Sequence, residues 1–142
     1  MPKSRFTPPP ADDTIFVDVY NTHIGIYYED SKELMDWGHS FGLNMRRGSG
    51  SEATSWFVED PDGIIWHFIV FHKPLTDIPT IAHECIHIAN GILECHGIEV
   101  NTTHDEALCY LQMFIFKTLL VMMSEKDKID LSLLEKKPAK KS

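Results

Sequence analysis

The chain has 142 residues, 43% of them hydrophobic, and a formal net charge of −8. This length and apolar fraction are typical of one globular domain that buries a core without covalent staples. The acidic balance argues against a nucleic-acid-binding surface. The three cysteines lack tight spacing, which argues against a disulfide framework. These features predict no nucleic-acid partner.

The composition divides the chain into three parts. We expect a proline-rich extended arm at residues 1–13, a single domain at residues 14–135, and a disordered basic tail at residues 136–142. The arm has no apolar signal-peptide region, which together with reduced cysteines predicts a cytoplasmic protein. The most apolar stretch, residues 107–123, is shorter than a membrane span and is expected to be a buried core helix.

The first half of the domain is predicted to be rich in strands, because apolar and β-branched residues alternate along it. The expected strands cover residues 14–20, 23–28, 54–59 and 64–72. A capping-box pattern at residues 30–33 opens a short helix, and residues 41–52 are rich in Gly and Ser and predict a loop. The sequence Asp-Pro-Asp-Gly at residues 60–63 predicts a hairpin turn.

The second half is predicted to be helical. Residues 79–96 form one helix, which begins with a proline in its first turn and ends at Gly97. Thr103 caps a longer helix that runs to about Met123, and residues 129–135 form a last short helix. Strands followed by helices predict an α+β domain with a mostly antiparallel sheet and both long helices packed on one face.

The first of these helices carries the motif HExxH at residues 83–87. A helix brings residues four apart onto one face, so His83 and His87 can offer two imidazole nitrogens to one Zn²⁺. Glu84 is turned by one residue and can take a proton from a zinc-bound water. Two core histidines bonded to carbonyl groups are the alternative interpretation. Metal binding is favoured because this mostly apolar helix leaves three polar groups in need of partners.

Eighteen residues separate His87 from Glu106, which opens the next helix within the sequence Asp-Glu-Ala. This arrangement, over residues 80–114, resembles the HExxH-x18-E pattern of gluzincin metallopeptidases. The resemblance implies that Glu106 is the third zinc ligand and that a zincin-like fold surrounds the site. Similar small domains occur in phage and bacterial proteins, including the ImmA/IrrE type, so the resemblance implies a phage-encoded or bacterial peptidase.

Other positions in the sequence are candidates for the third ligand. The metzincin pattern requires a histidine where this chain has Leu93, so it does not apply. His96 lies too far along the same helix, whereas His104 stays open as a ligand. Glu106 also fits a second role, as the third helical residue of a capping box that begins at Thr103.

Three residues near the motif have two interpretations each. Asp105 is either a hydrogen-bond acceptor for a ligand histidine or a carboxylate that favours the helix dipole. Tyr110 lies one turn after Glu106 and is either a catalytic donor to the developing oxyanion or a core tyrosine. Cys85 is expected to be a small core residue rather than a ligand.

The leading hypothesis is a zinc-dependent hydrolase that cleaves a peptide or protein substrate, with Glu84 as the general base. The resemblance to zincins further implies that the strand at residues 64–72, with His67 and His72, is an edge that pairs with substrate; the alternative is that both histidines face solvent. The competing hypothesis is a non-catalytic zincin-like module that binds zinc and a partner. No membrane contact is expected, and the sequence does not indicate an oligomeric state.

Overall fold

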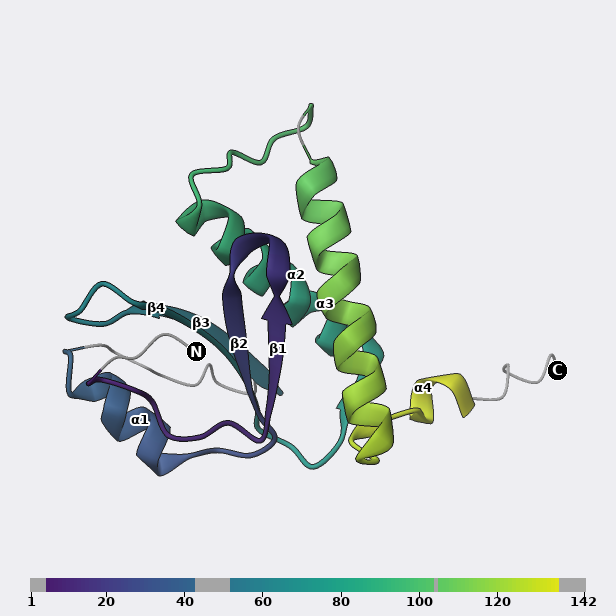
Figure 1. Ribbon diagram of the computed structural model, residues 1–142. Coiled ribbons are helices and arrows are strands. Elements are labelled where there is room, and N and C mark those ends of the chain that lie inside the picture. Colours follow the sequence, from purple (N-terminus) through teal and green to yellow (C-terminus); the bar gives the residue numbers. More distant parts are fainter. Residues whose placement is uncertain (1–4, 43–51, 104, 136–142) are drawn as a thin grey trace, which may run out of the picture.

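The computed structural model describes residues 5–42, 52–103 and 105–135 (Figure 1). Along the chain, the helices and strands alternate in the first half and give way to two long helices in the second. The elements are β1 (Asp13–Val17), the 3-10 turn η1 (Asp18–Tyr20), β2 (Thr22–Tyr27), α1 (Lys32–His39), β3 (Ala53–Glu59), β4 (Ile65–Phe71), β5 (Thr76–Asp77), α2 (Ile78–Cys95), α3 (Glu106–Glu125), β6 (Ile129–Asp130) and α4 (Ser132–Glu135).

Four strands form one sheet in the order β1-β2-β4-β3. The pairs β1/β2 and β3/β4 are antiparallel, and β2/β4 is parallel. The predicted α+β class with a mostly antiparallel sheet is therefore confirmed. The expectation that residues 64–72 form an edge is wrong, because β4 folds back from its hairpin and inserts between β2 and β3. The edge strand on this side of the sheet is β3.

The turn between β3 and β4 is built as its sequence predicts. The carboxylate of Asp60 accepts hydrogen bonds from the backbone N–H of Asp62 at 2.8 Å and of Ile64 at 3.0 Å, and from the indole of Trp66 at 2.9 Å. Gly63 has a φ of +79°, a left-handed conformation that glycine adopts without steric cost. Asp60 thus stabilises the turn and satisfies a buried indole at the same time.

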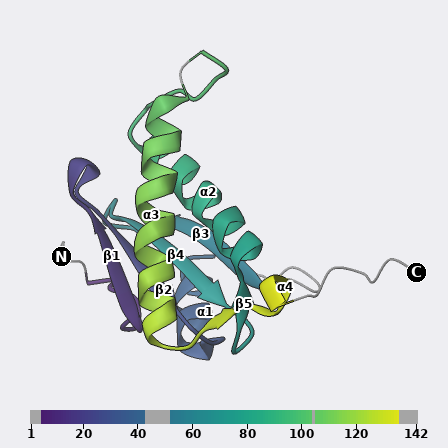
Figure 2. The ribbon, with the colours of Figure 1, turned by 90° about the vertical axis from the view of Figure 1, so that its right-hand side faces the viewer.

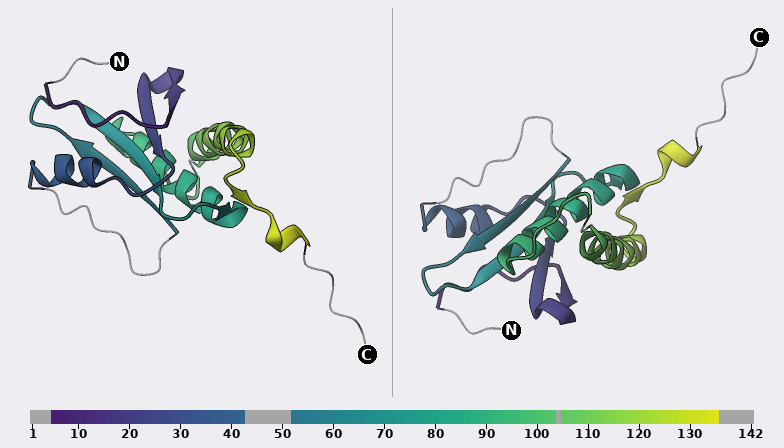
Figure 3. Two further views of the ribbon diagram at one scale, coloured as in Figure 1. Left: turned by 90° about the horizontal axis from the view of Figure 1, so that it is seen from below. Right: turned by 90° about the horizontal axis from the view of Figure 1, so that it is seen from above.

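The alternation of side chains along the strands gives the sheet two apolar faces. Ile24 and Ile69 belong to the core beneath α2 and α3, whereas Phe68 and Trp66 belong to the core beneath α1. Figure 3 shows the result: α1 lies on one side of the sheet, and the two long helices lie on the other. The expectation that both long helices pack on one face is borne out.

Helix α2 begins and ends at the predicted signals. The side chain of Asp77 accepts a hydrogen bond from the N–H of Thr80 at 2.8 Å, which caps the first turn. Pro79 stands in that turn, and the chain leaves the helix through Gly97, whose φ is +69°. Eight of its residues are buried, because α2 packs against both the sheet and its neighbour α3 (Figure 2).

Helix α3 is buried along one stripe only. Its buried residues are Leu111, Ile115, Leu119 and Met123. The opposite face exposes Tyr110, Phe114 and other apolar side chains. The prediction of a buried core helix therefore holds for a single face. Of the helices in the described ranges, α3 alone is long and apolar enough to cross a membrane by length and composition, a test that core helices of soluble proteins also pass.

Two predictions about element boundaries are corrected. Residues 129–135 do not form one helix: Ile129–Asp130 is the short strand β6, which pairs in parallel with β5, and α4 follows it. Thr103 does not cap α3, because α3 begins at Glu106 after Asp105. In the first place a strand pairing with β5 overrides the local signal. In the second, Thr103 donates its hydroxyl to the side chain of Asn101 instead of capping the helix.

Candidate metal site

The two histidines of the motif point to the same side of α2, as their spacing predicts. Both are exposed, and their Nε2 atoms lie 2.9 Å apart. A tetrahedral zinc ion with Zn–N distances of about 2.0–2.1 Å sets two imidazole nitrogens about 3.3 Å apart. The imidazoles of His83 and His87 therefore need only a small separation to hold one zinc ion, so this donor pair fits the metal.

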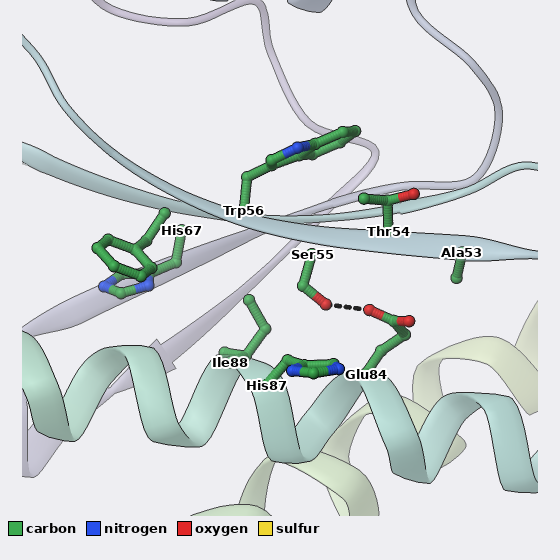
Figure 4. Close-up of a pocket in the computed structure, with 9 residues that line it drawn as sticks. Ala53, Thr54, Ser55, Trp56, His67, Glu84, His87 and Ile88 are labelled. Carbon is green, nitrogen blue, oxygen red and sulfur yellow. Dashed lines mark hydrogen bonds between the residues drawn. The ribbon is translucent and has the colours of Figure 1, made fainter. Parts of the chain in front are cut away.

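Glu84 is turned away from solvent, toward the sheet. It is buried, and its Oε2 accepts a hydrogen bond from the hydroxyl of Ser55 on β3 (Figure 4). Glu84 thus lies between its own helix and the edge strand, one residue away from the exposed His83. Sequence reasoning missed Ser55, because only the register of β3 against α2 brings its side chain to the motif.

A hollow of about 340 Å³ opens between β3 and α2 beside Glu84. Its lining combines the polar residues of the motif with apolar and aromatic side chains of both elements. The lining residues are Ala53, Thr54, Ser55, Trp56, Phe57, His67, Glu84, His87 and Ile88. A cleft that joins a buried carboxylate, an imidazole and apolar walls is suited to bind part of a substrate next to the reacting groups.

Gly91 sets how closely β3 approaches α2. A Cβ atom at this position would lie 3.1 Å from Cδ1 of Phe57, tighter than an ordinary contact. The glycine thus lets the Phe57 ring approach the backbone of α2 one turn beyond His87. This contact places the aromatic ring in the wall of the cleft.

His67 is buried on β4 at the inner side of this cleft. Burial, with a smaller contribution from the charge of His96, lowers the pKa of His67 from 6.5 to about 4. The side chain of His72, at the end of β4, is also buried, and its ring nitrogens bond to Asp30 and Thr54. The alternative interpretation, that both histidines face solvent, is therefore wrong.

The predicted third ligand is not close to the histidine pair in this structure. Glu106 is the exposed first residue of α3, not the third residue of a capping box. Among the residues that the structure describes, no three His, Cys, Asp or Glu side chains form a group that could hold a metal ion. His104 lies outside the described residues, so its role as a ligand stays a prediction.

A second hollow, of about 430 Å³, adjoins the first on the other side of Glu84 and includes His83 and Glu52 in its lining. Glu52 stands just before β3. Its carboxylate accepts hydrogen bonds from Lys73 at 2.9 Å and from Thr80 at 3.4 Å. Thr80 lies one turn before the motif on the same face of α2. Sequence reasoning missed Glu52 because it belonged to the predicted loop at residues 41–52, and no local pattern indicates its contact with Thr80.

The remaining residues that the sequence singled out are Asp105, Tyr110 and Cys85. Asp105 is exposed, precedes α3, and its side chain makes no capping hydrogen bond. Tyr110 is 65% exposed and lines a separate apolar hollow between η1 and α3. It is therefore not a core tyrosine, and it does not line the cleft that holds Glu84. Cys85 is buried in the core as expected, and burial raises the pKa of its thiol to about 12.

No protein-family model, no curated protein and no solved structure matches this chain. The fold and the site nevertheless define a class of protein. The chain is an α+β protein in which one core helix presents an imidazole pair to solvent and a buried glutamate to an edge strand.

Proposed function

We propose that this protein is a zinc-dependent hydrolase that cleaves peptide bonds, with Glu84 as its general base. The observation that carries the proposal is the placement of Glu84. Its carboxylate is buried at the floor of a cleft, beside an imidazole pair whose Nε2 atoms lie 2.9 Å apart. A buried carboxylate in that position has a hydrogen-bond donor on one side and open space for a reacting molecule on the other.

The role of each group follows from its position. A zinc ion, when bound by His83 and His87, would supply Lewis acidity and lower the pKa of a water molecule toward neutrality. Glu84 then takes the proton of the attacking water and passes it to the leaving amine. The hydroxyl of Ser55 donates to Oε2 of Glu84 and holds the carboxylate in one orientation. The other oxygen is left to accept the proton.

The edge strand gives the proposal its substrate class. β3 pairs with β4 on one side, and within the described residues no strand pairs with its other side. An extended peptide can add to such an edge through main-chain hydrogen bonds. A peptide aligned on β3 would run past Ser55, next to the cleft that holds Glu84. Its scissile carbonyl carbon would then lie within reach of the water that Glu84 deprotonates.

Two carboxylates compete for the third ligand position. The spacing of eighteen residues after His87 favours Glu106, which would require α3 to approach the motif more closely. Glu52 is favoured by its present place, in a hollow that it shares with His83. Its side chain is already held against Thr80 on the motif face of α2. Zinc affinity of the two carboxamide variants separates these assignments.

The central test uses the full-length chain loaded with zinc, with metal content measured by mass spectrometry and activity by a panel of quenched peptides. Glu84→Gln is expected to keep stoichiometric zinc and to lose turnover. His87→Gln is expected to lose both zinc and turnover, whereas the matched control His39→Gln, at the exposed end of α1, keeps both. Full activity in Glu84→Gln, or a wild-type protein that binds no zinc, would overturn the proposal.

The ligand test uses cobalt in place of zinc, because its absorption spectrum reports the coordination sphere. We expect one of Glu106→Gln and Glu52→Gln to weaken metal binding and alter the spectrum, while the other leaves both unchanged. His104→Gln completes the series. Stoichiometric metal binding with no cleavage of any peptide would favour the competing function, a non-catalytic zinc-binding module.

A further inference from the structure

The imidazole of His67 occupies an unusual position. It lies on β4, in the interior of the sheet, and only 2% of the residue is exposed. Figure 4 shows its ring on the α2 side of the sheet, on the same side as Ser55 and Glu84. It lines the cleft next to the motif. A polar ring has therefore been placed at the inner wall of the proposed substrate site.

The ring is not fully satisfied by the protein. Nδ1 of His67 is buried and has no hydrogen-bond partner within the described part of the chain. The other buried imidazole, that of His72, provides the contrast, since Asp30 and Thr54 engage its two nitrogens. A buried polar atom without a partner is costly and rare in folded proteins, so a structural role does not account for His67.

The surroundings define what His67 can bind. Its low pKa keeps the ring uncharged near neutral pH, so it offers one N–H donor and one acceptor. The ring centroid of Phe57 lies 6.0 Å away at an interplanar angle of 36°, and Phe57 is half exposed. Ile88 forms the helix side of the same cleft. The part of the cleft around His67 thus combines apolar and aromatic walls with one neutral polar ring, and it suits an apolar group that carries one hydrogen-bonding atom.

We propose that His67 is a specificity-determining residue that hydrogen-bonds the hydroxyl of a tyrosine side chain of the substrate. Phe57 and Ile88 then pack against the ring of that tyrosine. This inference rests on the proposed function. A neutral imidazole gives no charge attraction to a carboxylate or an ammonium group. A flat aromatic body packs on the half-exposed ring of Phe57 better than a branched aliphatic one.

The first experiment needs neither zinc nor activity. The full-length, zinc-free protein is titrated with p-cresol, the side-chain analogue of tyrosine, and with toluene, which lacks the hydroxyl, and binding is followed by NMR. p-Cresol is expected to bind about tenfold more tightly than toluene, the ratio that one neutral hydrogen bond gives. The shifts should centre on Phe57, His67 and Ile88. Equal affinity for the two probes would overturn the proposal.

Variants then assign the effect to the imidazole. His67→Phe keeps an aromatic ring and removes both nitrogens, so the ratio of affinities should fall to about one. His67→Gln retains a donor and an acceptor and should preserve part of the preference, which keeps the test valid if His67→Phe does not fold. An unchanged preference for p-cresol in folded His67→Phe would refute the assignment.

Cleavage provides the second readout. Two peptides that differ only in Tyr or Phe at one position are compared with the wild-type protein and His67→Phe, with Glu84→Gln as the inactive blank. The wild type should cut the Tyr peptide with a higher kcat/KM, and His67→Phe should not discriminate. If no peptide is cut while p-cresol binds as expected, the proposed hydrolysis fails and the ligand preference of His67 stands.

Discussion

Titration of His67 should make the stability of the protein depend on pH. In the folded state its pKa is about 4, whereas the ordinary value is 6.5. The unfolded chain therefore binds a proton to this ring at a higher pH than the folded protein does. Well above pH 6.5 the ring is neutral in both states, so its titration does not contribute to the pH dependence of stability. As pH falls from 6.5 to about 4, protonation of the unfolded chain lowers the free energy of unfolding.

The size of the effect follows from the shift. A difference of one pKa unit corresponds to about 1.4 kcal/mol, so the shift of His67 gives about 3 kcal/mol between neutral pH and pH 4. The side chain is almost completely buried, so solvent screens little of this difference. For a domain whose total stability is on the order of 5–15 kcal/mol, this is a large loss.

The assay is urea denaturation at about pH 7 and about pH 4.5, with the wild-type chain and His67→Phe compared at each value. His67→Phe leaves every other titratable residue in place, so the difference between the two proteins isolates this ring. The wild type should lose about 2 kcal/mol more than the variant over this interval. His39→Gln, an exposed control, should follow the wild type. The same loss in wild type and His67→Phe would refute the reasoning.

Three further predictions concern packing. Leu119 is fully buried between α3 and the core, so Leu119→Ala should lower the free energy of unfolding by about 2–5 kcal/mol in urea denaturation. Trp66→Phe removes the indole donor to buried Asp60 and should lower the free energy of unfolding by about 1–3 kcal/mol. An unchanged midpoint of urea denaturation would contradict this. Gly91→Ala should stabilise α2 by about 0.5–1 kcal/mol if the half-exposed ring of Phe57 shifts to make room for the new methyl group. A melting temperature below that of the wild type would show that the ring does not shift.

The parts of the fold that the sequence predicted well depend on neighbouring residues. The predicted short helix α1 is present, and Ser31 caps it by accepting a hydrogen bond from Leu34 N–H at 3.1 Å, one residue later than the capping-box pattern at residues 30–33 places the cap. The hairpin at Asp60 and the end of α2 at Gly97 also follow from local turn chemistry. The same holds for the imidazole pair, since a spacing of four on a helix determines that His83 and His87 share a face.

Most of the errors arose where distant segments meet. The resemblance to zincins placed the sheet edge on the strand at residues 64–72, but β4 is interior because it pairs with β2 as well as β3. Local polarity did not show that His67 is buried, since burial depends on the sheet register and on α2. The start of α3 was misplaced for a different, local reason: Thr103 donates its backbone N–H and its hydroxyl to Oδ1 of Asn101, so its side chain is engaged in the loop and does not cap the helix.

The contact between Ser55 and Glu84 joins the two halves of the chain at the proposed active site, so it deserves the sharpest test. Removing the hydroxyl in Ser55→Ala leaves the carboxylate free to rotate and without its donor. A hydrogen bond to a charged group contributes about 1.5–3 kcal/mol, so kcat should fall by about tenfold to a hundredfold. KM and zinc content should change little, because the side chain of Ser55 binds neither substrate nor metal in this scheme, and the substitution leaves the main chain of β3 intact. Ser55→Thr keeps the hydroxyl and should restore most of the rate. Equal kcat values for wild type and Ser55→Ala would show that Glu84 is oriented by α2 alone, and that β3 contributes only the binding edge.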